Sequence, residues 1–168
     1  MNNFILILLI FSALLILFSN LQEPQIPTEF VDNRTVDAYS NLIYSYDIIR
    51  YPSSAEITPL GSLNGSIILG FVTDNWNLNF GGVPANGSYV TRTINLHNSE
   101  DNDVIVRMKS YGNITPMIEF ERNDFVLKSA ESTTVNVVFN SGVFDIGDYS
   151  GEIDIIIEKH IYNFPPIN

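Results

Sequence analysis

The segments TTVNVVFN (residues 133–140) and GEIDIIIE (residues 151–158) decide the fold class of this chain. Each places an apolar residue at every second position, and successive side chains of a β-strand point to opposite faces of a sheet. The residues that share a face are Val135, Val137 and Phe139 in the first segment and Ile153, Ile155 and Ile157 in the second. This pattern predicts two strands, each with one face in a hydrophobic core.

Five further segments of the same kind precede these two. They are Ser66–Phe71, Trp76–Phe80, Tyr89–Leu96, Val104–Lys109 and Met117–Glu121. Turn-forming residues separate the segments, at Gly81-Gly82, Asn86-Gly87, residues 98–102, Tyr111-Gly112-Asn113 and Ser141-Gly142. About seven short strands with no helix between them predict an all-β sandwich over residues 55–162. Its expected core contains Trp76, Phe80 and Phe139, and Arg92, at an inward position, indicates an edge strand or a side chain that reaches solvent.

Two patches of this region resemble a known group of domains. The first comprises LNFGGV (78–83), Gly87 and RTINLHN (92–98), and the second comprises VNVVF (135–139) and GDYSGEI (147–153). Together they resemble the Hydin-type immunoglobulin-like domains and their relatives among major sperm protein domains and surface-anchored prokaryotic modules. The resemblance covers residues 76–158 and implies an immunoglobulin-like β-sandwich that binds proteins. The proline that follows the V-x-F strand in that family is absent, because Asn140 and Ser141 stand there.

The residues Asp145, Gly147 and Tyr149 have the spacing of a tyrosine corner. In that motif the phenol bonds a backbone group upstream and fixes the turn into the next strand. Gly147 permits a positive φ angle, and Gly151 is expected to relieve crowding where strands cross.

The first 21 residues are predicted to be a transmembrane anchor. Residues 4–18 are almost entirely apolar, and the first charged side chain is Glu23. About 20 uncharged residues in a helix match the ~30 Å hydrocarbon core of a bilayer. The apolar run is at the short end of that range, so a cleaved signal peptide is the alternative. Residues 19–22 lack the small-residue pair of a cleavage site, which favours a retained anchor.

No Lys or Arg precedes the apolar run, so the usual orientation signal is missing. The acidic domain and its glycosylation signals place the folded part outside a cell membrane crossed once. Residues 22–54 are interpreted as a stalk, in which the spacing of Val36, Tyr39, Ile43, Tyr46 and Ile49 or Arg50 allows a short amphipathic helix. The tyrosines of this region (Tyr39, Tyr44, Tyr46 and Tyr51) would lie at the bilayer interface or cover one end of the domain. Residues 163–168 form a tail.

The composition excludes several functions. With 8 basic and 19 acidic side chains the net charge is −11, which repels phosphates and argues against a nucleic-acid partner. The absence of cysteine excludes disulfides and thiolate chemistry, and it favours a prokaryotic source.

Asparagine offers the candidate modification sites. Four N-x-S/T sequons occur, at Asn33, Asn64, Asn86 and Asn113. They predict N-glycosylation if the domain is exported, although Asn and Gly are also ordinary turn residues.

One acidic loop offers a candidate metal site. Glu100, Asp101 and Asp103, with Asn102, provide oxygen ligands of the kind that Ca²⁺ prefers, and Asp145 and Asp148 are possible additional ligands. The ordinary interpretation is a solvated loop, since the 12-residue calcium loop pattern is absent. His97 and His160 lie at predicted strand ends without the further ligands that zinc or a catalytic triad needs.

These observations predict a membrane-anchored extracytoplasmic module that binds another cell-envelope protein through its β-sandwich. No enzyme active site and no cofactor are expected. Two alternatives stay open: a surface receptor domain for Ca²⁺ or carbohydrate, and an accessory or stator of an archaeal surface filament.

Overall fold

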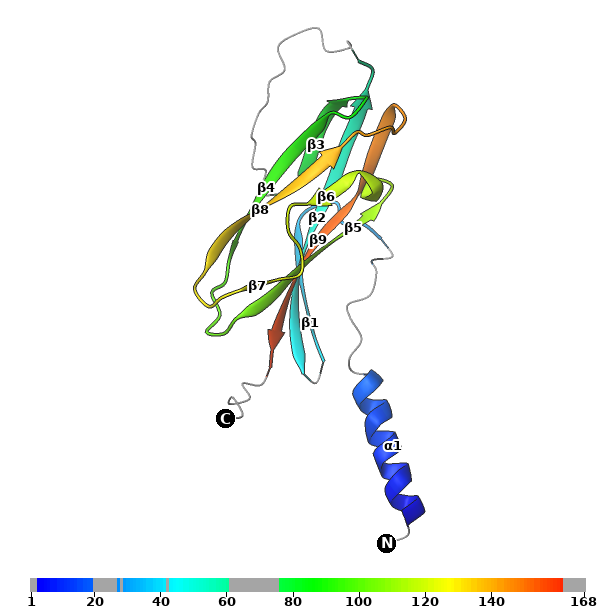
Figure 1. Cartoon of the computed structure of the whole chain (residues 1–168), viewed down its shortest axis with the longest axis vertical. Helices are drawn as coiled ribbons and strands as arrows, with labels where there is room; N and C mark the ends of the chain where they lie inside the picture. The colour runs from blue at the N-terminus through cyan, green and yellow to red at the C-terminus, as the bar shows by residue number, and fades with distance from the viewer. Residues whose placement is uncertain (1–2, 20–26, 28, 42, 61–75, 162–168) are drawn as a thin grey trace.

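The protein is mostly β-structure, with a single helix ahead of nine strands (Figure 1). The computed structural model describes residues 3–19, 27, 29–41, 43–60 and 76–161. The elements are α1 (Asn3–Ser19), β1 (Thr35–Ser40), β2 (Tyr44–Thr58), β3 (Leu78–Pro84), β4 (Tyr89–His97), β5 (Val104–Gly112), a 3-10 turn η1 (Thr115–Met117), β6 (Ile118–Phe120), β7 (Phe125–Leu127), β8 (Ser132–Asn140) and β9 (Gly147–His160). The all-β prediction is confirmed.

The strands form two sheets. The larger sheet has the order β1-β2-β9-β5-β7, and the smaller sheet has the order β4-β8-β6. Strand β3 also joins the larger sheet, where it pairs with β2 in parallel. Strands β1 and β3 lie end to end along one edge of β2, because β1 pairs with residues 45–50 and β3 with residues 53–58. Strand β9 occupies the other edge of β2 along nearly its whole length.

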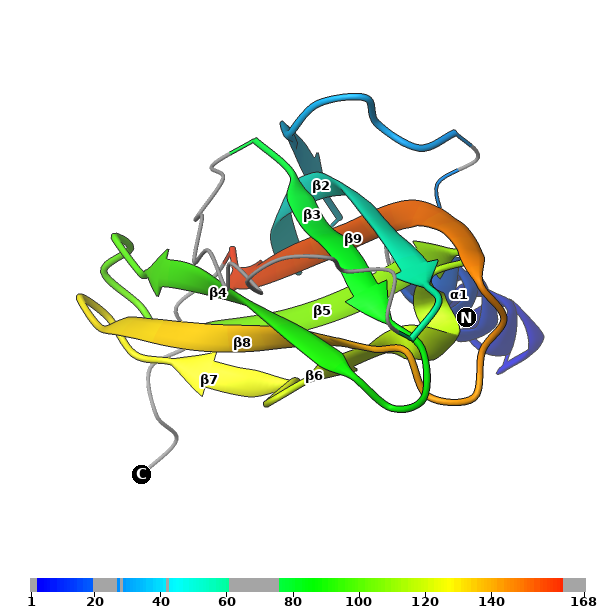
Figure 2. The same cartoon turned by 90° about the horizontal axis from the view of Figure 1, so that it is seen from above.

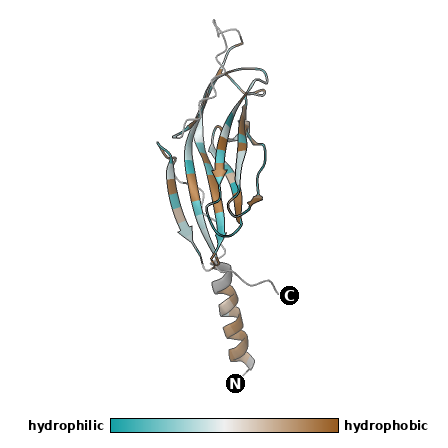
Figure 3. Cartoon of the chain, turned by 90° about the vertical axis from the view of Figure 1, so that its left-hand side faces the viewer, coloured by the Kyte–Doolittle hydropathy of each residue, from teal (hydrophilic) through white to brown (hydrophobic). Residues whose placement is uncertain are grey.

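The two sheets pack face to face around one hydrophobic core (Figure 2). The alternating residues of the deciding segments behave as predicted: Val135, Val137, Phe139, Ile153 and Ile155 are fully buried, and Ile157 packs against the same core. The rings of Phe80 and Phe139, from opposite sheets, lie 5.6 Å apart between centroids. Apolar and polar positions therefore alternate along the strands, as the hydropathy colours of Figure 3 show.

The stalk interpretation of residues 22–54 is wrong where the structure describes them. Residues 35–40 and 44–54 are strands of the larger sheet, and no helix is present between residues 29 and 41 or between 43 and 60. The expected boundary at Ala55 falls inside β2. Tertiary pairing with β9 outweighs the helical spacing of the tyrosines and isoleucines, which are themselves good strand formers.

Several local predictions are also corrected. Trp76 is 66% exposed, so it is not a core residue. Gly81 does not end a strand: it has φ +70° inside β3, at a shift in the register with β2, so Gly81-Gly82 forms a bulge. The sequence pattern did not predict β7. The strand predicted at Met117–Glu121 extends one residue beyond β6 at each end. The predicted strand Ser66–Phe71 and the sequon at Asn64 lie outside the described residues.

Three expectations about special residues agree with the geometry. The Tyr149 hydroxyl donates a hydrogen bond of 2.8 Å to the carbonyl oxygen of Asp145. A Cβ atom at Gly151 would overlap the carbonyl oxygen of Tyr111 on the neighbouring β5. Arg92 lies on β4, an edge strand of the smaller sheet, and its Nε donates to the carbonyl oxygen of Asn79 at 2.7 Å.

Helix α1 is apolar on all sides. Its described side chains, residues 4–15, are all exposed, and Ser12 is the only polar one among them (Figure 3). In the described part of the chain, no helix is both long and apolar enough to cross a membrane.

Candidate functional site

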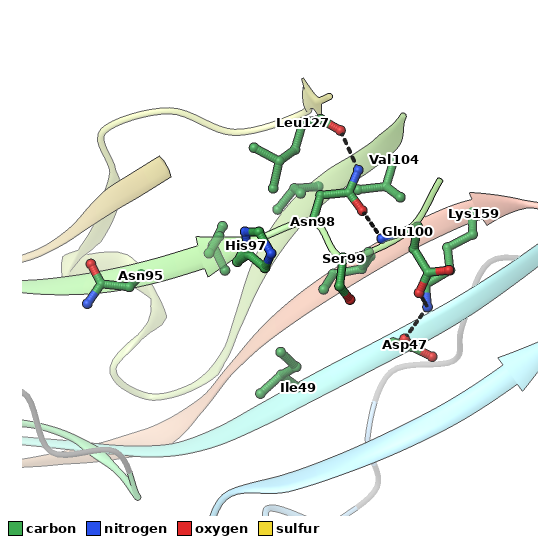
Figure 4. Close-up of a pocket in the computed structure, with 13 residues that line it drawn as sticks. Asp47, Ile49, Asn95, His97, Asn98, Ser99, Glu100, Val104, Leu127 and Lys159 are labelled. Carbon is green, nitrogen blue, oxygen red and sulfur yellow. Dashed lines mark hydrogen bonds and ion pairs between the residues drawn. The ribbon is translucent and has the colours of Figure 1, made fainter. Parts of the chain in front are cut away.

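A pocket of about 250 Å³ lies between the two sheets, near the end that carries the β1–β2 turn (Figure 4). Its floor consists of aliphatic side chains from both sheets, and its rim is polar. The floor residues are Ile49, Leu96, Val104, Val106, Leu127 and Ile157, and the rim residues include Asp47, His97, Glu100 and Lys159. The mixture allows an apolar group to enter while polar groups stay at the mouth.

Lys159 closes one side of this pocket between two carboxylates. Its Nζ lies 2.6 Å from Asp47 Oδ2 and 2.7 Å from Glu100 Oε1. Burial alone would lower the pKa of Lys159, but the hydrogen bonds and charges of the two acids outweigh burial and raise it. One cation shared by two anions leaves the rim with a net negative charge, so the pocket favours cationic over anionic groups.

The buried amide of Asn98 holds the loop at the mouth of the pocket. Its Nδ2 donates to the carbonyl oxygens of Asn102 and Leu127, at 2.9 and 3.0 Å. Its Oδ1 accepts from the backbone N–H of Glu100 at 3.0 Å. All three bonds lie within the loop or join it to β7, so Asn98 has a structural role.

The acidic residues proposed to bind Ca²⁺ do not converge. Glu100 turns towards Lys159, whereas Asp103 Oδ1 accepts from the backbone N–H of Ser129 at 3.0 Å. Asp101 is exposed, and Asp145 and Asp148 belong to the opposite end of the sheets. Among the described residues, no three His, Asp or Glu side chains are grouped so that they could hold a metal ion.

The two histidines have separate partners. His97 Nδ1 is 2.9 Å from the hydroxyl of Ser132. The ring of His160 lies 4.8 Å from that of Tyr44 between centroids. Both histidines lie at strand ends, as predicted.

The described sequons are accessible. Asn33, Asn86 and Asn113 are all exposed, as their modification requires. Asn113 also accepts a hydrogen bond through Oδ1 from the backbone N–H of Ser150, at 2.7 Å. Its Nδ2, the atom to which a glycan is attached, is not used in that bond.

A second cluster of charges lies on the outer face of the larger sheet. Arg50 donates through Nε to Glu152 Oε1 at 2.7 Å and through Nη2 to Oε2 at 3.1 Å. Glu152 is completely buried, and its Oε2 also accepts from the backbone N–H of Val31 at 2.8 Å. Arg50 Nη2 donates in addition to the carbonyl oxygen of Glu29 at 3.1 Å. The cluster therefore fastens the segment before β1 across the outer face of β2 and β9.

Asp154 lies beside this cluster and is less well satisfied. Its Oδ1 is 3.9 Å from Arg50 Nε and has no hydrogen-bond partner among the residues that the structure describes. Burial, followed by the neighbouring Glu152, raises the pKa of Asp154 to about 7, although the positive charge of Arg50 acts in the opposite direction. The carboxyl group therefore changes its protonation near neutral pH.

The sequence pattern did not predict this cluster. Glu152, Asp154 and Glu158 lie on the face of β9 opposite Ile153, Ile155 and Ile157. Glu158 is buried beside Arg107, whose Nη1 donates to it at 2.8 Å. Acidic residues at alternate positions of a central strand, in a chain with only 8 basic residues, are the signal that points to buried ion pairs.

No protein-family model, curated protein or solved structure matches this chain.

Proposed function

We propose that the protein is a membrane-tethered extracytoplasmic interaction module, in which α1 inserts into the bilayer and the β-sandwich holds another cell-envelope protein. The observation that supports the proposal most directly is the apolar, exposed surface of α1. Its described side chains are apolar all round and exposed, so no other part of the described chain covers them. A helix with no polar face gains stability in water only if it is buried, and a bilayer provides that burial.

Helix α1 is shorter than the hydrocarbon core of a bilayer, so the proposed insertion requires a small mismatch. Its 17 residues extend over about 26 Å at ~1.5 Å per residue, slightly less than a ~30 Å hydrocarbon core. Local thinning of the bilayer accommodates a short segment at a fraction of a kcal/mol per ångström. The single membrane crossing is part of the same proposal.

The exterior location and the immunoglobulin-like assignment also belong to this proposal. The net charge of −11 and the three exposed sequons suit a cell surface. The two-sheet core and the bond from Tyr149 to Asp145 support the immunoglobulin-like assignment, and the resemblance to Hydin-type domains implies protein binding.

The end of the sandwich opposite the β1–β2 turn offers a surface for the partner. The loops at this end meet, since Ser141 donates from its backbone N–H to the carbonyl oxygen of Ser88 at 2.8 Å. We name the four large exposed apolar side chains here the distal tip: Leu60, Tyr89, Val143 and Ile146. Val143 is 99% exposed, and exposed apolar side chains gathered at one end of a domain are typical of a contact surface.

Membrane fractionation tests the tether. The variant Leu8→Lys/Leu15→Lys places two charges in α1, each costing about 3 kcal/mol in the centre of a bilayer. Leu8→Ile/Leu15→Ile is the matched control. The wild type and the control should stay with membranes during alkaline extraction, whereas the lysine variant should be released. A wild-type protein that is released by alkaline extraction contradicts the proposal.

Surface labelling tests the exterior location. Lys128 is exposed, so a membrane-impermeant amine reagent should label it in intact cells. The Lys128→Arg variant identifies the labelled position. Labelling of Lys128 that occurs only after the cells are broken would place the domain on the inner side.

Photo-cross-linking tests the role of the distal tip. A photoreactive amino acid at Val143 or Ile146 should give one specific adduct in intact membranes. The same amino acid at Val126, an exposed position on β7, is the control. Equal adducts from all three positions, or from none, would reject the distal tip as the partner surface.

A further inference from the structure

The turn between β1 and β2 and the end of β9 form an aromatic, uncharged surface. We name residues 39–41, 43–46 and 160–161 the hairpin end. The two segments are held together by a hydrogen bond of 2.9 Å from the backbone N–H of Ile161 to the carbonyl oxygen of Ile43. Tyr39 is 45% exposed, and Ile161 is also exposed.

The rings of the hairpin end form one continuous group. Tyr46 lies 6.0 Å from Tyr39 and 6.1 Å from Tyr44 between ring centroids, and Tyr44 lies 4.8 Å from His160. Tyr46 is buried under its neighbours, so the group presents Tyr39 and Tyr44 outward from a packed base. Tyrosines arranged in this way combine an apolar ring with a hydroxyl, which suits the interface between lipid headgroups and acyl chains.

The hairpin end itself carries no charged side chain. The chain carries 27 charged side chains, 8 basic and 19 acidic, yet residues 38–46 and 160–161 contain no Asp, Glu, Lys or Arg. Charges flank this surface, where Lys159 is paired with Asp47 and Glu100. The uncharged surface itself meets a lipid interface without the cost of desolvating carboxylates.

Three backbone N–H groups at this turn, those of Asn41, Ile43 and Tyr44, are paired. Asn41 Oδ1 accepts from the N–H groups of Ile43 and Tyr44, at 2.9 and 2.8 Å. The N–H of Asn41 donates to the carbonyl oxygen of Tyr44 at 2.9 Å. Backbone groups that are already paired can approach an environment poor in water at little cost.

The length of the tether keeps this surface near the bilayer. The side chain of Glu152 fastens the chain at Val31. Glu152 and His160 are eight residues apart on β9, so the hairpin end lies about 27 Å along the strand from this fastening point. The twelve residues from Asn20 to Val31 span at most ~40 Å when fully extended. If α1 ends at the membrane surface, Val31 lies at most ~40 Å above that surface. When the strands are perpendicular to the membrane, the hairpin end lies about 27 Å closer to it than Val31, and therefore within about 13 Å of the surface. Figure 1 shows α1 and the β1–β2 turn at the same end of the molecule.

We propose that the hairpin end rests in the headgroup region of the bilayer that receives α1, as a second, non-covalent contact with lipid. The proposal rests on the membrane tether proposed above. The helix and the hairpin end then form two points of support, which hold the strands upright and turn the distal tip away from the membrane.

Depth-dependent fluorescence quenching tests this contact in the full-length protein. In a Trp76→Phe background, Tyr39→Trp places the only tryptophan at the hairpin end, and Tyr89→Trp places it at the distal tip as the matched control. Each protein is reconstituted into phosphatidylcholine vesicles with and without a headgroup spin label. Flotation of the vesicles is measured first, because it tests the tether independently of the hairpin end.

The expected result is a shift of the Tyr39→Trp emission to shorter wavelength and quenching several-fold stronger than that of Tyr89→Trp. Equal quenching of the two probes, or no quenching of Tyr39→Trp in protein that floats with the vesicles, overturns the contact and leaves the tether standing. Protein that does not float rejects the tether and the contact together. If Tyr39→Trp changes the circular dichroism spectrum, Ile161→Trp replaces it as the hairpin-end probe and the same criteria apply.

Discussion

Asp154 is the side chain whose surroundings suit its charge least. It is buried on the outer face of β9, with Oδ1 unpartnered in the described part of the chain and Arg50 only at 3.9 Å. Glu152 accepts two hydrogen bonds from the same arginine, from Nε at 2.7 Å and from Nη2 at 3.1 Å. A single guanidinium is thus opposed by two buried carboxylates, and the neutral form of Asp154 relieves the excess negative charge.

Replacing Asp154 with asparagine should therefore stabilise the protein at alkaline pH. The folded-state pKa of Asp154, about 7, lies above its ordinary value of 3.8. The folded state binds the proton more tightly, so the wild type loses stability as the pH rises from about 4 to about 7. Asp154→Asn should remove this dependence and have a higher urea midpoint than the wild type at pH 8. Asp148→Asn, at an exposed position, is the control, and a lower midpoint for Asp154→Asn at pH 8 would contradict the argument.

Gly151 should not tolerate a side chain. A Cβ atom there would overlap the carbonyl oxygen of Tyr111 and lie 2.9 Å from Ile114 Cγ2. Gly151→Ala should separate β9 from β5 at this point and cost about 3 kcal/mol of unfolding free energy. Gly82→Ala meets only Thr58 Cγ2, at 3.6 Å, and is the matched control. Equal urea midpoints for the two variants would show that the strands adjust freely.

At the scale of residues, the sequence predicts what depends on alternation and turn chemistry. The buried positions of β8 and β9, the Tyr149 bond and the need for glycine at position 151 all follow from local pattern. Trp76 and the pairing of Arg50 with Glu152 do not, because both depend on which segments meet in space. Tyr149 also shows a limit of local pattern, since its bond is exposed and a water molecule can replace it.

At the scale of elements, the segment before β1 behaves as a strap across the larger sheet. It is held by side chains of β2 and β9, through Arg50 to the carbonyl oxygen of Glu29 and through Glu152 to the N–H of Val31. The sequence gives no signal of this strap, because residues 22–34 contain no alternating pattern. Strands β1 and β2 were not predicted for a different reason. Their apolar spacing also fits a helix, and only pairing with β9 selects the extended form.

The variant Glu152→Gln should loosen the strap. Arg50, which is partly buried, would lose its nearest carboxylate, and removing one partner of a buried ion pair is strongly destabilising. Asp154 compensates part of the charge, so a loss of about 2–3 kcal/mol is expected rather than the ~3–5 kcal/mol of an isolated pair. Relative to the wild type, the rate of hydrogen exchange should increase more at the amide of Val31 than at the amides of β4 and β8. Glu119→Gln, at an exposed position of β6, is the control, and an unchanged Val31 amide would disprove the fastening.

At the scale of the whole molecule, the folded unit begins before β1 and ends after β9. Residues 27–161 contain all the strands of both sheets. This fragment should unfold cooperatively in urea and give a β-type circular dichroism spectrum. A fragment that starts at Ala55 lacks β1 and most of β2, which exposes the edge of β9, and it should not fold. A cooperative transition at the same midpoint in the shorter fragment would show that β1 and the first part of β2 are dispensable.

The pairing of β2 with β9 also sets the order in which the chain acquires its structure during synthesis. Tyr44 pairs with His160 and Ile57 with Gly147, so the two longest strands are neighbours in space and lie about 100 residues apart in the sequence. A ribosome releases β2 long before β9, and contacts of such high sequence separation form slowly because a long loop must close. Until then the β1–β2 hairpin has an unfilled edge, the kind of edge that recruits strands from other chains. The larger sheet closes only when residues 147–160 emerge, and the nascent chain therefore needs protection from its neighbours for nearly the whole time of its translation.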